Sequence, residues 1–155
     1  MVSYKALNTL NESKVSANSY SSTYLLEQND LLIARSGNTV GKTFLYNKND
    51  GPAIFAGYLI KFVVDENKVK PQYLLTYTKS SLFKDWVRTN LRISAQPNIN
   101  SQQYLQAPII VPAKSVQDDI IRMAADIHEI NMNLKNQVVS LKEQALKKFE
   151  QTIFE

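Results

Sequence analysis

The chain has 155 residues and an ordinary share of apolar side chains, which suffices for one globular core but hardly for two. It contains no cysteine, so disulfide bonds and thiolate metal sites are excluded and a reducing compartment is expected. Its first residues lack the apolar core of a signal peptide, and no apolar run approaches the length that spans a membrane. These features predict a cytoplasmic protein.

The net charge of +4 is unevenly distributed. Residues 1–115 carry thirteen Lys and Arg against seven Asp and Glu, whereas residues 116–155 carry five against seven. The first part is therefore basic and the last part slightly acidic. A basic surface suits a polyanion, although an excess of this size is also common on ordinary soluble domains.

Short strands and turns are expected in the first third of the chain. Residues 8–23 are rich in Ser, Asn and Thr and indicate a loop or a weak edge segment. The apolar run at 31–34 and the β-favouring run at 43–46 predict two strands, with a turn at 36–39 between them. A second turn is predicted at 47–52, where Asp-Gly and Gly-Pro both break regular structure.

The middle of the chain mixes strand and helix signals. The largely apolar residues 53–64 predict one long strand that bends at Gly57. Pro71 is predicted at the first turn of a helix. That helix carries Tyr73, Leu74, Leu75 and Tyr77. A second helix is expected at 80–91, and its inward side chains are Leu82, Phe83, Trp86 and Val87. Residues 93–103 are polar and predict irregular structure, followed by a last strand at 104–111 that Pro112 ends.

The last forty residues or so predict one continuous helix. Ser115 and Asp118 have the spacing of a capping box, and no Gly or Pro follows them. Apolar residues recur at three- and four-residue steps and place one stripe on one face of the helix. This apolar seam consists of Ile120, Met123, Ile127, Ile130, Leu134, Val138, Leu141, Ala145, Phe149 and Ile153.

At about 1.5 Å per residue such a helix is roughly 60 Å long, too long for a head of this size to cover. One interpretation is a terminal helix that folds back on its own domain; the other, which the length of the seam favours, is a coiled-coil arm that docks a partner. The fold class is therefore α+β, with a small mixed domain at 1–114 and a long C-terminal coiled-coil helix at 115–155.

Three motifs suggest enzymes but fit them poorly. The segment 37–43 resembles a phosphate-binding loop, but it has three residues between its glycines where four are needed, and a β-favouring run follows. A hairpin turn explains it better. Asp50 with Glu66 and Lys68 imitates a magnesium-dependent nuclease, yet both acids lie in turn-like sequences. His128 is the only histidine and has no nucleophile at a recognisable spacing, so a solvated helix residue is expected.

Basic residues of the second helix suggest another chemistry. Lys84, Arg88 and Arg92 follow one another at four-residue steps, so a helix aligns them on one face. Such a stripe is either a solvated face or a row of phosphate contacts. The polar segment after it is rich in Asn and Gln, which are able to bond adenine in the major groove.

Several stretches occur in a characteristic order. Residues 30–37 read DLLIARSG, and VGK follows at 40–42. The apolar run at 53–62 is followed by PQYL at 71–74. Residues 94–100 read SAQPNIN, with Leu105, PIIVP at 108–112 and QDDI at 117–120 after them. In this order they resemble the specificity subunit of Type I restriction-modification enzymes.

The resemblance implies a fold and a role. In that family a target recognition domain reads one half of a split double-stranded DNA site. The helix after it pairs antiparallel with a second such helix and docks the methyltransferase subunits, and through them the restriction subunits. The subunit has no catalysis of its own and needs no cofactor or metal. A recognition domain usually extends further in front of Asp30, so this chain is expected to be a partial, C-terminal copy with possible self-association through its helix.

Candidate DNA contacts follow from the charge and the resemblance together. The candidates for backbone contacts are Arg35, Lys42, Lys84, Arg88 and Arg92. The candidates for base reading are Asn38, Thr39, Gln96, Asn98 and Asn100. Because a motif shared by domains of different specificity seldom reads variable bases, Gln96 and Asn98 are not expected to determine specificity. The seam from Ile120 to Phe149 is the expected partner-helix interface.

Two other functions stay open at this point. The chain is alternatively a coiled-coil interaction or assembly module of the same system without independent DNA binding. The third possibility is the small metal-dependent nuclease mentioned above.

Overall fold

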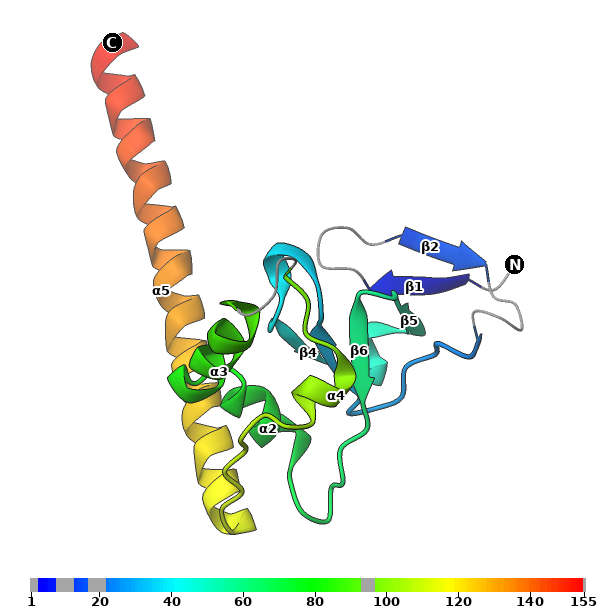
Figure 1. Ribbon diagram of the computed structural model, residues 1–155. Coiled ribbons are helices and arrows are strands. Elements are labelled where there is room, and N and C mark those ends of the chain that lie inside the picture. The colour runs from blue at the N-terminus through cyan, green and yellow to red at the C-terminus, as the bar shows by residue number, and fades with distance from the viewer. Residues whose placement is uncertain (1–2, 8–12, 17–21, 93–96, 155) are drawn as a thin grey trace. The chain divides into compact units, whose positions relative to one another are not determined.

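A computed structural model describes residues 3–7, 13–16, 22–92 and 97–154, with side chains at 22–91 and 97–154 (Figure 1). Its contacts divide the chain into two compact units, Met1–Gln117 and Asp118–Glu155. The first unit combines short strands and helices, and the second is helical. The α+β class is confirmed.

Six strands in the described part of the first unit form two three-stranded sheets. The first sheet has the order β2-β1-β5 and contains β1 (Ser3–Leu7), β2 (Ser13–Ser16) and β5 (Ala53–Phe55). The second has the order β4-β3-β6 and contains β3 (Leu31–Ala34), β4 (Thr43–Leu45) and β6 (Leu59–Phe62). β3 pairs antiparallel with both of its neighbours, whereas β1 and β5 are parallel.

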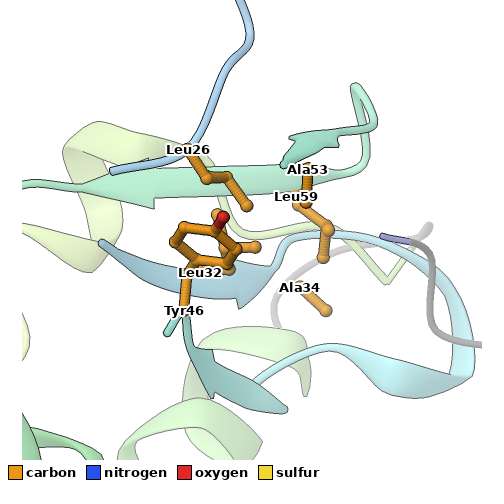
Figure 2. Packing of buried hydrophobic residues seen from close by; sticks show 6 residues of the cluster. All are labelled: Leu26, Leu32, Ala34, Tyr46, Ala53 and Leu59. Atoms are coloured by element: carbon orange, nitrogen blue, oxygen red, sulfur yellow. The ribbon is translucent and has the colours of Figure 1, made fainter. Parts of the chain in front are cut away.

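β3 is buried on both faces, which explains why its sequence is continuously apolar. Alternate side chains of a strand point to opposite faces. Leu32 and Ala34 pack into a cluster that also contains Leu26, Tyr46, Ala53 and Leu59 (Figure 2). Leu31 and Ile33 line a pocket of about 290 Å³ on the opposite face, together with Phe62, Phe83 and Tyr104. β3 is thus the centre of the core.

Four α-helices follow the sheets in the described part of the chain (Figure 1). They are α2 (Pro71–Tyr77), α3 (Ser81–Arg92), α4 (Ser101–Tyr104) and α5 (Lys114–Phe154). Pro71 occupies the start of α2, where the missing N–H has no intrahelical partner to lose. Among the described residues, no helix combines the length and hydropathy required to cross a membrane.

The predicted turns and the strands at 31–34 and 43–46 agree with the structure, but several strand predictions are wrong. The segment 8–23, predicted as a loop or a weak edge segment, contains the edge strand β2, so the second of these two interpretations holds there. The predicted single strand at 53–64 is two strands in different sheets, because a turn at Ala56–Tyr58 redirects the chain. The predicted strand at 104–111 does not form: Tyr104 ends α4, and the residues after it are irregular.

Three details of the helices also differ from the expectation. Part of the predicted irregular segment is α4, whose Asn100 cap and Gln103 form a capping box. Leu82 was expected inward but is 45% exposed, because Phe83 and Val87 occupy the core-facing side of α3. α5 begins at Lys114, so Ser115 lies within the first turn and not at the cap.

Gln117 ties three segments of the first unit together. Its side chain is fully buried. Its Oε1 accepts a hydrogen bond from the Lys70 N–H at 2.8 Å, and its Nε2 donates to the carbonyls of Lys68 at 3.2 Å and Pro112 at 2.9 Å. All hydrogen-bonding atoms of the amide therefore have partners, which offsets the desolvation of the group.

We expect Gln117→Leu to destabilise the first unit by about 2–4 kcal/mol, because it leaves buried backbone groups unpaired. Gln117→Glu should be at least as damaging, since a carboxylate at this site faces two carbonyl oxygens. Urea unfolding followed by the fluorescence of Trp86, the single tryptophan, measures both effects. The same two substitutions at the exposed Gln151 are the control and should change stability by less than about 0.5 kcal/mol.

Candidate nucleic-acid interface

A groove of about 490 Å³ separates the β3–β4 hairpin from α3. Its walls and floor are apolar and come from Val40 and Gly41 of the hairpin and Phe83, Val87 and Leu91 of α3. Four exposed cations surround this floor: Lys42, Lys79, Lys84 and Arg88. We call this the basic groove. Four cations around one opening attract an anion, and phosphates of a nucleic acid fit such a site.

Close packing between the hairpin and α3 sets the depth of the basic groove. Gly41 has a φ of +82°, and a Cβ at this position would lie 2.9 Å from Cγ1 of Val87. A larger residue would be strained by its backbone and would push α3 away. Thr43 Oγ1 and Thr78 Oγ1 are 2.7 Å apart and connect β4 to the end of α2. Gly41, the second glycine of the segment that resembles a phosphate-binding loop, is thus required for the packing of the hairpin against α3.

Tyr104 holds the hairpin from the side of α4. Its buried hydroxyl donates to the Ala34 carbonyl at 2.8 Å and accepts from the Gly41 N–H at 3.1 Å. Its ring packs against Trp86 of α3, with the ring centroids 5.8 Å apart. Burial raises the pKa of Tyr104 to about 12, and the hydrogen bond from Gly41 offsets part of that rise. One side chain thus links the hairpin, α3 and α4.

This pKa has a consequence for stability at high pH. The folded state keeps Tyr104 neutral above its ordinary pKa of 10.0, whereas the unfolded state ionises there. The contribution of neutral Tyr104 to the free energy of unfolding is therefore fully present below pH 10. It is lost as the pH rises towards about 12. Burial also raises the pKa of Tyr46, where the charge of Asp50 adds to the effect, and that of Tyr73.

We expect Tyr104→Phe to lower stability at neutral pH by about 1–2 kcal/mol, because the Ala34 carbonyl loses its hydroxyl donor. The variant should also lose less stability than the wild type between pH 10 and 12. Urea unfolding at a series of pH values tests both statements. Parallel pH curves for the two proteins would show that Tyr104 does not titrate in this range.

A second groove, of about 510 Å³, is formed where three segments of the first unit meet. We call it the polar groove. Its lining residues are Arg35, Ser36, Gly37, Gly57, Tyr58, Pro97 and Asn98. The Arg35 N–H donates to the Tyr58 carbonyl at 2.9 Å, and the Ile99 N–H donates to the Arg35 carbonyl at 2.8 Å. The first bond continues the β3–β6 pairing beyond the ends of both strands, and the second accompanies an isolated antiparallel bridge between Ser36 and Asn98.

The candidate contacts predicted from the sequence fall into these two places. Lys42, Lys84 and Arg88 surround the basic groove, and Arg35 and Asn98 line the polar groove. Asn38 and Thr39 belong to a short 3-10 turn, Gly37–Thr39, on the segment that runs from one groove to the other. Asn100 caps α4. The side chain of Arg92 and all of Gln96 lie outside the described residues.

Two lining residues were not found from the sequence. Lys79 lies in the connection between α2 and α3, so helical spacing does not relate it to Lys84 and Arg88. Tyr58 stands in what the sequence predicted as a strand interior, whereas the structure has a turn there. Only the tertiary arrangement brings them to the grooves.

The enzyme motifs find no support where the structure describes them. The segment 37–43 forms the predicted hairpin turn between β3 and β4. Across the described ranges, no three His, Cys, Asp or Glu side chains are grouped as they would be to hold a metal ion. Glu66, one of the two nuclease-like acids, accepts a hydrogen bond from Asn29 at 2.9 Å. His128 is an exposed residue of α5.

Comparison with known proteins decides the family. Residues 1–151 match the family described as Type I restriction modification DNA specificity domain. The chain belongs to this family. This family match confirms the resemblance inferred from the sequence. A search of curated proteins finds no match.

A solved structure shares the fold of this specificity domain. It is described as "Structural basis underlying complex assembly and conformational transition of the type I R-M system", and the match has a TM-score of 0.64 at 14% identity. The match covers 96% of the specificity domain and 40% of the solved chain. The specificity domain therefore corresponds to less than half the length of that structural relative.

The second unit of the specificity domain carries the apolar seam. Seam residues such as Ile127 and Leu134 are 59% and 52% exposed. Charge is distributed asymmetrically along α5. Residues 114–134 contain two basic and four acidic side chains, whereas residues 135–154 contain four basic and two acidic ones. The first half of the helix is therefore acidic and the second half basic.

Proposed function

We propose that this chain is the DNA-reading specificity component of a Type I restriction-modification enzyme. The recognition domain at 1–114 binds one half-site of double-stranded DNA, and the helical arm at 115–155 joins methyltransferase subunits and, through them, restriction subunits. The chain itself carries out no catalysis and confers the choice of sequence. Its place of action is the cytoplasm.

The basic groove is the observation that carries the DNA-binding part of the proposal. Lys42, Lys84 and Arg88 come from a hairpin and a helix, and Lys79 from the loop between helices, yet all four cations line one opening. Arg88 also pairs with Asp85 at 3.0 Å, but both side chains are more than 60% exposed, so the pair competes weakly with a phosphate. Such cations position a duplex without reading its sequence.

The charge of α5 supports an antiparallel partner helix. If two copies of α5 pair antiparallel, the acidic half of each helix faces the basic half of the other. A parallel pair would place like charges together over the whole length, which is unfavourable at the edges of a coiled coil. The same charge pattern suits the arm of a second specificity segment as the partner.

DNA selection tests the proposal directly. The full chain is incubated with duplexes that have a randomised centre, the bound pool is sequenced, and the affinity of the selected duplex is measured at several salt concentrations. We expect an enriched half-site and an affinity that falls steeply with salt. An absence of DNA binding, with unchanged binding to methyltransferase subunits, would favour the assembly-module alternative.

A further inference from the structure

Gly57 has no intramolecular reason to be a glycine within the described part of the molecule. Positive φ values occur at Gly37, Gly41 and Gly51, but not at Gly57. A Cβ built on Gly57 meets no heavy atom of the described residues within 4 Å. Both the backbone conformation and the surrounding space would therefore accept a side chain here. A glycine that the fold does not require is typical of a place where a ligand approaches the backbone closely.

Gly57 lies in the wall of the polar groove, beside Tyr58. The Leu59 N–H donates to the Ala56 carbonyl at 2.9 Å and closes the turn, and the bond from the Arg35 N–H to the Tyr58 carbonyl fastens it to the end of β3. The turn is thus held by backbone bonds on both sides. Tyr58 itself is 36% exposed and offers a ring and a hydroxyl.

Arg35 is already oriented in this groove. Its Nε donates to Oδ1 of Asn98 at 3.3 Å, an exposed bond that favours an orientation of the guanidinium group within the groove. Its two terminal nitrogens make no hydrogen bond or ion pair to any residue that the structure describes. A guanidinium with both terminal nitrogens available is suited to two parallel hydrogen bonds, such as those to O6 and N7 of guanine.

We propose that the polar groove is the base-reading site of the domain: Arg35 bonds a guanine edge in the major groove while the Gly57–Tyr58 turn touches the neighbouring base. This inference rests on the proposed DNA-reading function and adds that the two grooves have different roles in DNA binding. The basic groove binds phosphates, and the polar groove determines sequence. Asn98 acts as a positioning residue for Arg35, in line with the expectation that it does not determine specificity. Arg35, which the sequence analysis placed among the backbone contacts, has a base-reading role in this proposal instead.

The test compares Gly57→Ala and Gly57→Leu with the wild type, as full chains, on the selected duplex and on duplexes with single base changes. Because the fold has room at this position, neither variant should lose thermal stability. Discrimination between the selected duplex and its variants should fall with the size of the side chain, by about fivefold or more for Leu at the affected base pair. The dependence of affinity on salt should stay unchanged.

Arg35→Lys provides a second measurement, since lysine keeps the charge but does not form the two parallel bonds. We expect lost preference at one guanine with an unchanged salt slope. If both Gly57 variants bind with wild-type discrimination, the base-reading site lies elsewhere even though the domain binds DNA. If they instead weaken binding equally on all sequences, the groove meets the DNA backbone and the inference is wrong. If the wild-type chain binds no DNA, the proposed function itself fails.

Discussion

Replacing Ile127 and Leu134 together by Asp should abolish association of the chain through α5. Both positions lie on the apolar seam and are exposed in the chain by itself. A partner helix that covers the seam would bury two unpaired carboxylates, each at a cost of several kcal/mol. Sedimentation velocity over a range of concentrations should show only single chains, and co-purification with methyltransferase subunits should be lost.

The matched control for this prediction is Met132→Asp with Asn136→Asp. These exposed positions lie about 140° and 180° around the helix from Ile127, on the side away from the seam, and they add the same charge. The control should associate as the wild type does. Circular dichroism adds an independent measurement, because a long helix without a partner is only marginally stable and should lose helicity in the seam variant. If sedimentation velocity gives the same mass for the seam variant and the control, the seam is not part of the interface.

The second large effect is expected from Lys84→Gln combined with Arg88→Gln. Glutamine keeps most of the aliphatic stem over the apolar floor of the basic groove and removes the charge. Each lost phosphate contact lowers the slope of log affinity against log salt by about 0.9, so the slope should fall by about two. Affinity for the selected duplex should drop by about ten- to a hundredfold at low salt, with the same sequence preference.

Lys48→Gln with Lys68→Gln is the charge-matched control. Both lysines are exposed residues of the first unit, and neither lines the basic groove. Because the change in net charge is identical, a difference between the two double variants reports on position alone. Equal salt slopes for the two would mean that α3 does not touch the DNA, and that the net positive charge of the first unit acts without a defined site.

The local part of the fold was predictable because its signals are short-range. The run at 31–34 predicted β3, Pro71 predicted the start of α2, and the three- and four-residue steps predicted a helix that the structure has at Lys114–Phe154. Each of these elements is specified by residues within a few positions of one another. The strand predicted at 104–111 was wrong because that prediction also used only local signals, whereas a strand needs a partner elsewhere in the chain. Its apolar residues form no ladder, and two of their backbone carbonyls accept hydrogen bonds from the hydroxyls of Tyr73 and Tyr77 of α2 instead.

The candidate DNA-binding surface was only partly predictable. Helical spacing related Lys84 to Arg88, but nothing local connects them with Lys42 or Lys79, which reach the same groove from other segments. Gly57 looked like a bend inside a strand, and Tyr58 carried no signal at all. Their role depends on the pairing of Arg35 with Tyr58 and of Arg35 with Ile99, contacts between residues more than twenty positions apart.

The sequence by itself therefore determined the α+β class, the long helix with its apolar seam, the basic character of the first part and the family resemblance. These are properties of composition, of periodicity and of the order of short motifs along the chain. Only the tertiary structure decided that residues 53–64 divide between two sheets, and that separate segments converge to form a basic groove and a polar groove. The physical reason is that a strand's partner, and hence the surface that its ends create, is chosen by long-range packing and backbone pairing, which no local pattern encodes.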